Sequence, residues 1–241
     1  MATQSEQALE NNLIKQLVVM GYERVSVPDE AAMVANLKIQ LEKHNETSFS
    51  DNEFERVLNQ LNKGGVYDRA HTLREKMSLV RDDNTRKNIE FFNTKKWCNN
   101  QFQVTNQVAQ KGRYQNRYDV TILINGFPLV HIELKRRGIE LKEAFNQVNR
   151  YRQHSFASNY GLYQFVQLFV ISNGVNTKYY SNTVGYGNPK KESFKFTSFW
   201  ADKENKHITE LEDFAREFLD KCHLAKMIAL YTVLTAKKEV K

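Results

Sequence analysis

Two strand-like segments joined by an Asn-Gly dipeptide constrain the fold of this chain more than any other feature. The segments are "YDVTILI" and "LVHIELK", with "NGFP" at residues 125–128 between them. An Asn-Gly pair between two such runs is the strongest short-range signal for a β-hairpin, because both central residues of the turn it favours need positive φ angles. The sequence therefore predicts an antiparallel hairpin that closes at Asn125 and Gly126.

Each strand of this hairpin carries an acidic residue in otherwise hydrophobic surroundings. The strand period of two places His131, Glu133 and Lys135 on one face of the second strand. Counting outward from a two-residue loop puts Asp119 opposite residues 132 to 134. We therefore expect Asp119 and Glu133 to converge, with Lys135 beside them. For His131, an ordinary surface or core role remains the alternative to a place near this group.

Two carboxylates and an ammonium group at the end of a hydrophobic hairpin suggest chemistry, since buried charges cost several kcal/mol unless they are paired or bind a metal. Mg²⁺ prefers oxygen ligands, with one or two carboxylates supplemented by water and phosphate oxygens. A lysine beside such a metal can orient or deprotonate a water, or neutralise charge that develops on a phosphate. The pattern fits metal-dependent phosphodiester hydrolysis, and it also fits a cross-strand ion pair at a sheet edge.

The rest of the chain alternates between helical and strand-like patterns, which predicts a mixed α/β fold. Helices are expected over residues 4–20, 29–43, 50–62, 139–154, 207–220 and 222–234. Further strands are expected at "YERVSV", "KMSLV", "NIEFFN", "FQVTNQV", "QFVQLFVIS" and "TKYYSN". Ser50 with Glu53 three positions on is a capping-box pattern. We expect a single domain over residues 1–241, with its core at about 76–182 and a helical part at 1–65.

Composition narrows the class of protein without deciding its function. The sequence has 35 Lys and Arg against 28 Asp and Glu, a formal charge of +7. This surplus favours polyanionic partners, but a solvated lysine-rich surface explains it equally well. The first twelve residues do not resemble a secretory signal, and no apolar run is long enough to cross a bilayer, so we expect a soluble, cytoplasmic protein without a membrane partner. Cys98 and Cys222 lack CxxC spacing, so neither a disulfide framework nor a structural zinc site is predicted.

The segment "RYDVTILINGFPLVHIELKRRGIELKEAFNQVNRY" closely resembles the amino-terminal nuclease domain of the restriction (HsdR) subunit of type I restriction-modification enzymes, members of the PD-(D/E)xK nuclease superfamily. The resemblance includes "QVNRY", which fits the QxxxY element of the family, "VQLFVISNG", and the first helix in "SEQALENNLIKQLVVMGYERVSV". It covers nearly the whole chain and is strongest over residues 117–181. It implies an α+β fold with a central mixed β-sheet flanked by helices.

The resemblance also implies a metal site. Asp119 and Glu133 would ligate Mg²⁺, with Mn²⁺ as a substitute, aided by the backbone carbonyl of Leu134, and Lys135 would be the catalytic lysine. The first helix of the family brings a glutamate toward the metal, and Glu10 is the matching position.

Two further groups of side chains are candidates for supporting roles. Glu6, one turn before Glu10, is the alternative first-helix glutamate. Gln147 and Tyr151 of the QxxxY element share one helical face, where support of the metal-binding strand, phosphate contact and plain structural bonding are equally compatible. DNA contact or simple solvation explains the basic side chains of Arg117, Arg136, Arg137, Lys190 and Lys191.

The implied function is that of a Mg²⁺-dependent endodeoxyribonuclease domain that acts on double-stranded DNA together with methyltransferase and specificity subunits. Subunits of the family continue into an ATP-driven translocase, but this sequence has no G-x-x-x-x-G-K-[ST] loop. We therefore expect ATP to be needed only by a full-length protein, with helices at 207–234 leading toward a motor that is absent here. The alternative is a non-catalytic DNA-docking or assembly module that is inactive without the rest of the complex.

Overall fold

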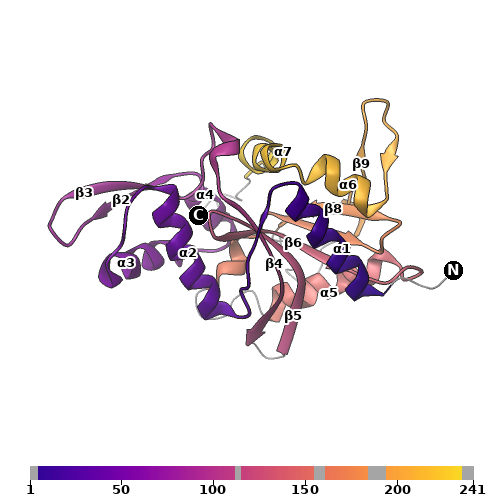
Figure 1. Cartoon of the computed structure of the whole chain (residues 1–241), viewed down its shortest axis with the longest axis horizontal. Helices are drawn as coiled ribbons and strands as arrows, with labels where there is room; N and C mark the ends of the chain where they lie inside the picture. The colour runs from indigo at the N-terminus through magenta and orange to yellow at the C-terminus, as the bar shows by residue number, and fades with distance from the viewer. Residues whose placement is uncertain (1–4, 112–114, 155–160, 184–193, 235–241) are drawn as a thin grey trace, which may run out of the picture.

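A six-stranded mixed sheet forms the centre of the computed structural model, which describes residues 5–111, 115–154, 161–183 and 194–234 (Figure 1). The strand order is β1-β4-β5-β6-β7-β8. The strands are β1 (Glu23–Arg24), β4 (Phe102–Lys111), β5 (Gln115–Ile124), β6 (Phe127–Leu134), β7 (Leu168–Ser172) and β8 (Thr177–Ser181). The β1–β4 and β6–β7 pairs are parallel and the other neighbours are antiparallel. The predicted mixed α/β fold is confirmed.

Helices pack on the central sheet and form further layers of the molecule. Helix α1 (Glu6–Val19) contacts β4, β5 and β6, and α5 (Leu141–His154) contacts β6 and β7. Figure 1 shows α2 (Glu30–His44), α3 (Asp51–Leu61) and α4 (Val66–Thr72) at one end of the molecule, and α6 (Leu211–Phe218) and α7 (Lys221–Lys226) above the sheet. The α1 helix buries Leu9, Leu13, Ile14 and Leu17 together with Glu10. A carboxylate thus lies on the helix face that packs on the sheet.

The predicted hairpin is present and closes where the Asn-Gly pair lies. Asn125 and Gly126 have φ angles of 51° and 83°, the left-handed values that such a turn requires. The ladder runs from Ile124↔Phe127 to Val120↔Ile132, with a register shift between Ile122 and Leu123. Asp119 and Glu133 are the next residues beyond the last of these pairs. The register therefore brings the two acids to the same level of the sheet, as the sequence predicted.

Gly126 is expected to tolerate no side chain. Its φ is positive, and an added Cβ would lie 2.7 Å from the Cα of Leu37 in α2. We predict that Gly126→Ala lowers the free energy of unfolding by about 2 to 4 kcal/mol, because strain and overpacking add. Gly138 also has a positive φ, but a Cβ there meets no atom within 4 Å. Urea denaturation should therefore show a loss of only about 1 kcal/mol for Gly138→Ala; equal losses in both variants would contradict the steric argument.

Several elements differ from the sequence prediction. β2 (Lys76–Val80) and β3 (Arg86–Glu90) form a separate two-stranded sheet against α3, outside the central sheet, and α4 was not predicted. The expected helix at 207–220 begins only at Leu211, because His207–Ile208 is strand β10, paired with β9 (Trp200–Ala201). The helix expected at 222–234 is α7 followed by the π-helical turn η4 (Met227–Tyr231). The strand expected at "QFVQLFVIS" begins at Leu168, after the 3₁₀ turn η2 (Leu162–Phe165). Short apolar runs do not show enough of a repeat to distinguish a helix from a strand or to fix where either one begins.

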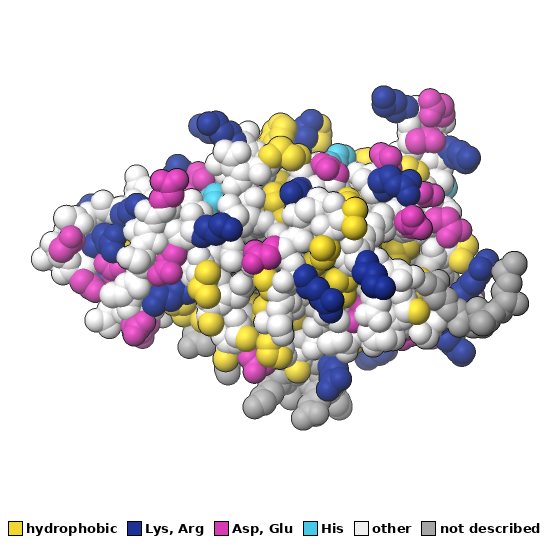
Figure 2. Space-filling view, viewed as in Figure 1, with side chains coloured by type: hydrophobic (Ala, Val, Ile, Leu, Met, Phe, Trp, Pro, Cys, Tyr) yellow, Lys and Arg dark blue, Asp and Glu magenta, His cyan; other side chains and the backbone are white. Residues whose placement is uncertain are grey.

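The surface carries both signs of charge. On the face shown in Figure 2, basic and acidic side chains are interspersed, and the tip of the β9–β10 hairpin carries both. Among the described residues, no helix is long and apolar enough to cross a membrane.

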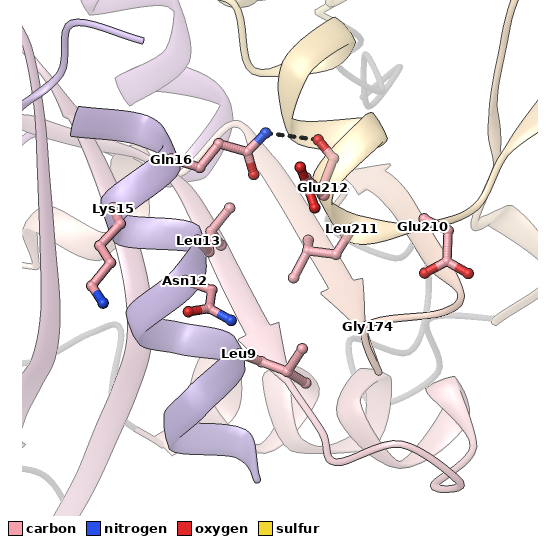
Figure 3. A pocket seen from close by; sticks show the side chains of 9 residues that line it. All are labelled: Leu9, Asn12, Leu13, Lys15, Gln16, Gly174, Glu210, Leu211 and Glu212. Carbon is pink, nitrogen blue, oxygen red and sulfur yellow. Dashed lines mark hydrogen bonds between the residues drawn. The ribbon is translucent and has the colours of Figure 1, made fainter. Parts of the chain in front are cut away.

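A surface pocket of about 380 Å³ lies between α1 and α6 (Figure 3). The Gln16 amide donates a hydrogen bond to the Glu212 carbonyl at 2.7 Å across one end of it. Gly174 closes the other end, where a Cβ would lie 2.9 Å from Leu9 Cδ2. Asp119, Glu133 and Lys135 do not line this pocket.

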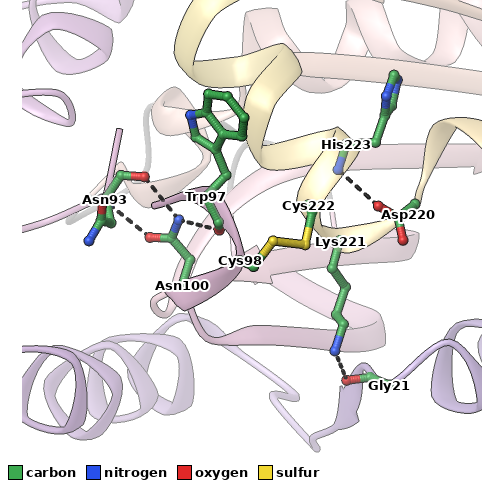
Figure 4. Close-up of a disulfide and its surroundings, with 9 residues drawn as sticks. All are labelled: Gly21, Asn93, Trp97, Cys98, Asn100, Asp220, Lys221, Cys222 and His223. Atoms are coloured by element: carbon green, nitrogen blue, oxygen red, sulfur yellow. Dashed lines mark hydrogen bonds between the residues drawn. A yellow bond between two sulfur atoms is a disulfide. The ribbon is translucent and has the colours of Figure 1, made fainter. Parts of the chain in front are cut away.

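The structure corrects the prediction about the cysteines. Cys98 in the short 3₁₀ helix η1 (Trp97–Asn99) and Cys222 in α7 form a disulfide between residues 124 positions apart in the sequence (Figure 4). Nothing in the local spacing reveals the pairing, because it depends on α7 packing against η1. Nearby, the Lys226 ammonium group lies 5.2 Å from the ring centre of Trp97.

Reduction of this disulfide is expected to destabilise the fold. A disulfide typically contributes about 2 to 4 kcal/mol, largely by constraining the unfolded chain, and long loops lie at the upper end of the range. We predict that dithiothreitol lowers the urea midpoint of the wild type and leaves that of Cys98→Ser unchanged. An equal effect of the reductant on both proteins would show that the loss does not come from this bond.

Candidate active site

The three predicted site residues lie together where β5 and β6 meet. Asp119 Oδ2 accepts a hydrogen bond of 2.8 Å from the backbone N–H of Leu134. The Lys135 ammonium donates to Glu133 Oε1 and to the Leu134 carbonyl, each at 3.0 Å. The parallel β7 strand fixes the backbone here, since the Lys135 N–H donates to the Ser172 carbonyl at 2.8 Å. All four predicted groups, including the Leu134 carbonyl, are therefore within one small network.

This network is largely removed from water. The side chain of Glu133 is 0% exposed and that of Lys135 is 12% exposed. Burial, followed by repulsion from Glu133, raises the pKa of Asp119 from 3.8 to about 7, and the Leu134 N–H offsets only part of this rise. The two acids thus repel each other at neutral pH, with Lys135 as the cation that partly compensates them.

One oxygen of Glu133 remains available. Glu133 Oε2 is buried and accepts no hydrogen bond within the described part of the chain. His131 Nε2 lies 3.4 Å from this oxygen. His131 is fully buried, with its ring 5.2 Å from that of Tyr118. The histidine that the strand period placed on this face therefore lies beside Glu133, inside the protein.

The two candidate glutamates of α1 have different surroundings. Glu6 is exposed and accepts a hydrogen bond of 3.2 Å from the backbone N–H of Arg136. Glu10 is 3% exposed, and its negative charge is one of those that raise the pKa of Asp119. Glu10 is therefore the buried glutamate of α1 whose charge acts on Asp119. It is held by Asn106 and Gln107 of β4, two residues that the sequence analysis did not single out.

Through Tyr151, the QxxxY pair of Gln147 and Tyr151 contacts the two residues that precede Asp119 in β5. The Gln147 amide donates to the Tyr151 hydroxyl, which donates to the Arg117 carbonyl at 3.3 Å. The Tyr151 ring packs edge-on against Tyr118, with 4.8 Å between ring centres. Burial and the nearby Glu133 raise the pKa of the Tyr151 hydroxyl. These contacts connect α5 to the strand residues next to Asp119.

The predicted DNA-contacting residues divide into two groups. Arg117, Arg136 and Arg137 are exposed beside the network. Arg137 also lines a second pocket, of about 570 Å³, whose walls include Phe194 and Phe199. Lys190 and Lys191 lie outside the described residues.

The side chains present fit a divalent cation in part. Among the described residues, no three His, Cys, Asp or Glu side chains gather closely enough to hold a metal without other ligands. The donors available are instead the carboxylates of Asp119 and Glu133 and the Leu134 carbonyl. Hard oxygen donors of this number suit Mg²⁺, which keeps several water ligands. Glu133 Oε2 is buried and accepts no hydrogen bond from the described residues, and such a cation would give this oxygen a partner.

Comparisons with known proteins identify the family of this chain. The family model described as "Type I restriction enzyme R protein N terminus" matches residues 3–188. The chain belongs to this family. It is 47% identical over 240 residues to the endonuclease subunit of the type I restriction enzyme SsaAORF53P of Staphylococcus saprophyticus, covering 97% of this chain and 25% of that protein. It is 40% identical over 241 residues to the endonuclease subunit of EcoprrI of Escherichia coli, covering 98% of this chain and 76% of that protein.

Membership of the R protein family confirms the resemblance seen in the sequence. The matched range of the R protein model includes Glu10, Asp119, Glu133, Lys135, and the Gln147 and Tyr151 pair. The chain spans about a quarter of the length of the staphylococcal R proteins it matches, including one of Staphylococcus aureus at 45% identity.

Proposed function

We propose that this chain is a divalent-cation-dependent endodeoxyribonuclease that hydrolyses phosphodiester bonds in double-stranded DNA. The observation that carries the proposal is the convergence of Asp119, Glu133, Lys135 and the Leu134 carbonyl. Glu133 Oε2 is buried there and accepts no hydrogen bond within the described part of the chain. The names of the relatives, endonuclease subunits of type I restriction enzymes, favour the same reading.

Asp119, Glu133 and the Leu134 carbonyl would hold the cation, Mg²⁺ or Mn²⁺. When bound, the cation supplies charge that stabilises the phosphate in the transition state and lowers the pKa of water. Lys135 contacts two of the proposed ligands and retains some exposure, so its ammonium group can face the substrate phosphate. In the reaction, a water oxygen bonds to phosphorus, one P–O bond of the DNA backbone breaks, and the departing oxygen takes a proton.

The exposed arginines beside the network would position the DNA. Arg117, Arg136 and Arg137 can contact phosphates, which gives binding that does not depend on sequence and weakens with salt. We propose that recognition of a target sequence comes from the specificity and methyltransferase subunits of a type I complex, in the cytoplasm. ATP would be used only by the translocase of a longer protein. We propose that Gln147 and Tyr151 support the strand residues around Asp119. The Gln147 amide donates to the Tyr151 hydroxyl, which in turn donates to the Arg117 carbonyl.

A plasmid assay tests the proposed function. The wild type should nick or linearise supercoiled plasmid in Mg²⁺ or Mn²⁺ and do neither in EDTA. Asp119→Ala and Glu133→Ala should lose the cleavage. Unchanged cleavage in both variants would contradict the site. A wild type that binds DNA but does not cleave it in Mg²⁺ or in Mn²⁺ would favour a docking or assembly module instead.

A further inference from the structure

Neutral amide donors surround the buried Glu10 carboxylate. Asn106 Nδ2 donates to Glu10 Oε1 at 2.5 Å, and Gln107 Nε2 donates to Glu10 Oε2 at 2.6 Å. Gln7, one turn earlier on α1, adds a longer contact of 3.3 Å to Oε1. Amides supply hydrogen bonds without positive charge. These donors therefore fix the orientation of the carboxylate without cancelling its charge.

An unusual backbone conformation lets two consecutive residues reach the same carboxylate. In a regular strand, neighbouring side chains point to opposite faces, so Asn106 and Gln107 should not share a partner. Gln107 has a φ of 55°, in the left-handed region that residues other than glycine rarely adopt. This conformation interrupts the alternation of β4 and turns the Gln107 amide toward Glu10.

The interruption of β4 lies beside the proposed cation site. β4 and β5 pair through Asn106↔Val120 and Val108↔Tyr118, so Gln107 lies at the level of Asp119. Strained backbone that persists in a folded protein is often found at functional sites, where the surrounding structure maintains it. Here the strained residue, its carboxylate partner and Asp119 all lie at one level of the sheet.

We propose that Asn106 and Gln107 are positioning residues that hold the Glu10 carboxylate in the orientation in which its negative charge strengthens cation binding at Asp119 and Glu133. This inference rests on the proposed function and adds two residues to it. The amides act through Glu10 and do not touch the cation or the DNA. Partners of this kind typically contribute 10- to 100-fold to metal affinity.

Cation binding without DNA tests the proposal separately from cleavage. Titration of the 241-residue chain with Mn²⁺ should show affinity reduced about 10-fold in Asn106→Leu and Gln107→Met. Glu10→Gln gives the full loss of Mn²⁺ affinity that removal of the negative charge of Glu10 causes. Adding either amide variant to Glu10→Gln should cause no further loss, because the amides act only through Glu10. Gln7→Met, which removes the longest of the three amide contacts from an exposed residue, is the matched control and should bind Mn²⁺ nearly as the wild type does.

Folding is monitored by thermal denaturation in EDTA. Gln107→Gly removes the same amide and accepts the positive φ, so it keeps the test valid if Gln107→Met does not fold. Wild-type Mn²⁺ affinity in the folded amide variants, or losses that add to Glu10→Gln, would overturn the positioning role. If Asp119→Ala binds Mn²⁺ as the wild type does, the proposed function itself fails, and the two failures are thereby distinguished.

Discussion

Lys135→Met is expected to slow DNA cleavage by about 100-fold or more while leaving divalent-cation affinity intact or tighter. The ammonium group donates to Glu133 Oε1 and to the Leu134 carbonyl, two of the proposed cation ligands. It therefore competes with a cation for the same oxygens, and its removal frees them. The chemical step loses the charge that faces the substrate phosphate. Single-turnover cleavage of plasmid and calorimetric titration with Mn²⁺ measure the two effects separately.

A matched control comes from the β9–β10 hairpin, where Lys203 is exposed. Lys203→Met makes the same chemical change away from the network and should cleave at the wild-type rate. A Lys135→Met variant that loses cation binding and cleavage together would mean that the lysine is structural. One that cleaves normally would remove it from the mechanism.

Asp119→Asn should stabilise the cation-free protein at alkaline pH by about 2 to 4 kcal/mol. The folded-state pKa of Asp119 is raised to about 7 from 3.8 by burial and by Glu133. Below pH 3.8 the carboxyl group is protonated in both the folded and the unfolded state and has no effect on stability. As the pH rises from about 4 to about 7, the unfolded state ionises more readily, so the free energy of unfolding falls. The loss is complete above pH 7, and asparagine avoids it.

Thermal denaturation in EDTA across pH 4 to 8 measures this difference. The melting temperatures of wild type and Asp119→Asn should lie close together at pH 4 and separate toward pH 8. Mg²⁺ should raise the wild-type melting temperature at pH 8 more than at pH 5, because protons compete with the cation for Asp119. Asp51→Asn alters an exposed carboxylate and should not reproduce the pH dependence. A gap between Asp119→Asn and wild type that is the same at every pH would contradict the electrostatic explanation.

The hairpin and its acids could be predicted because each depends on local signals. The Asn125-Gly126 pair determines the turn, the strand period places His131 and Glu133 on one face, and counting from the turn gives the level of Asp119. The Ser50 and Glu53 capping box at the start of α3 is present for the same reason. The resemblance in sequence then supplied the family, which the comparisons confirm.

Other features could not be predicted because they depend on how distant segments pack. The Cys98–Cys222 disulfide requires η1 and α7 to meet, although 124 residues separate them. Asn106 and Gln107 look like ordinary polar residues of a strand, and only the positive φ of Gln107 turns both amides to Glu10. Burial of Glu133 Oε2 likewise follows from the packed sheet around β6 rather than from its own sequence.

The most direct measurement is the position of a cation in a crystal of the wild type soaked in Mn²⁺, located by its anomalous scattering. We predict a peak about 2.1 Å from oxygens of Asp119 and Glu133, with the Leu134 carbonyl as a further ligand. The same soak of Asp119→Asn should show the peak weakened or lost. A Mn²⁺ ion bound elsewhere, or no peak at saturating Mn²⁺ in the wild type, would contradict the account.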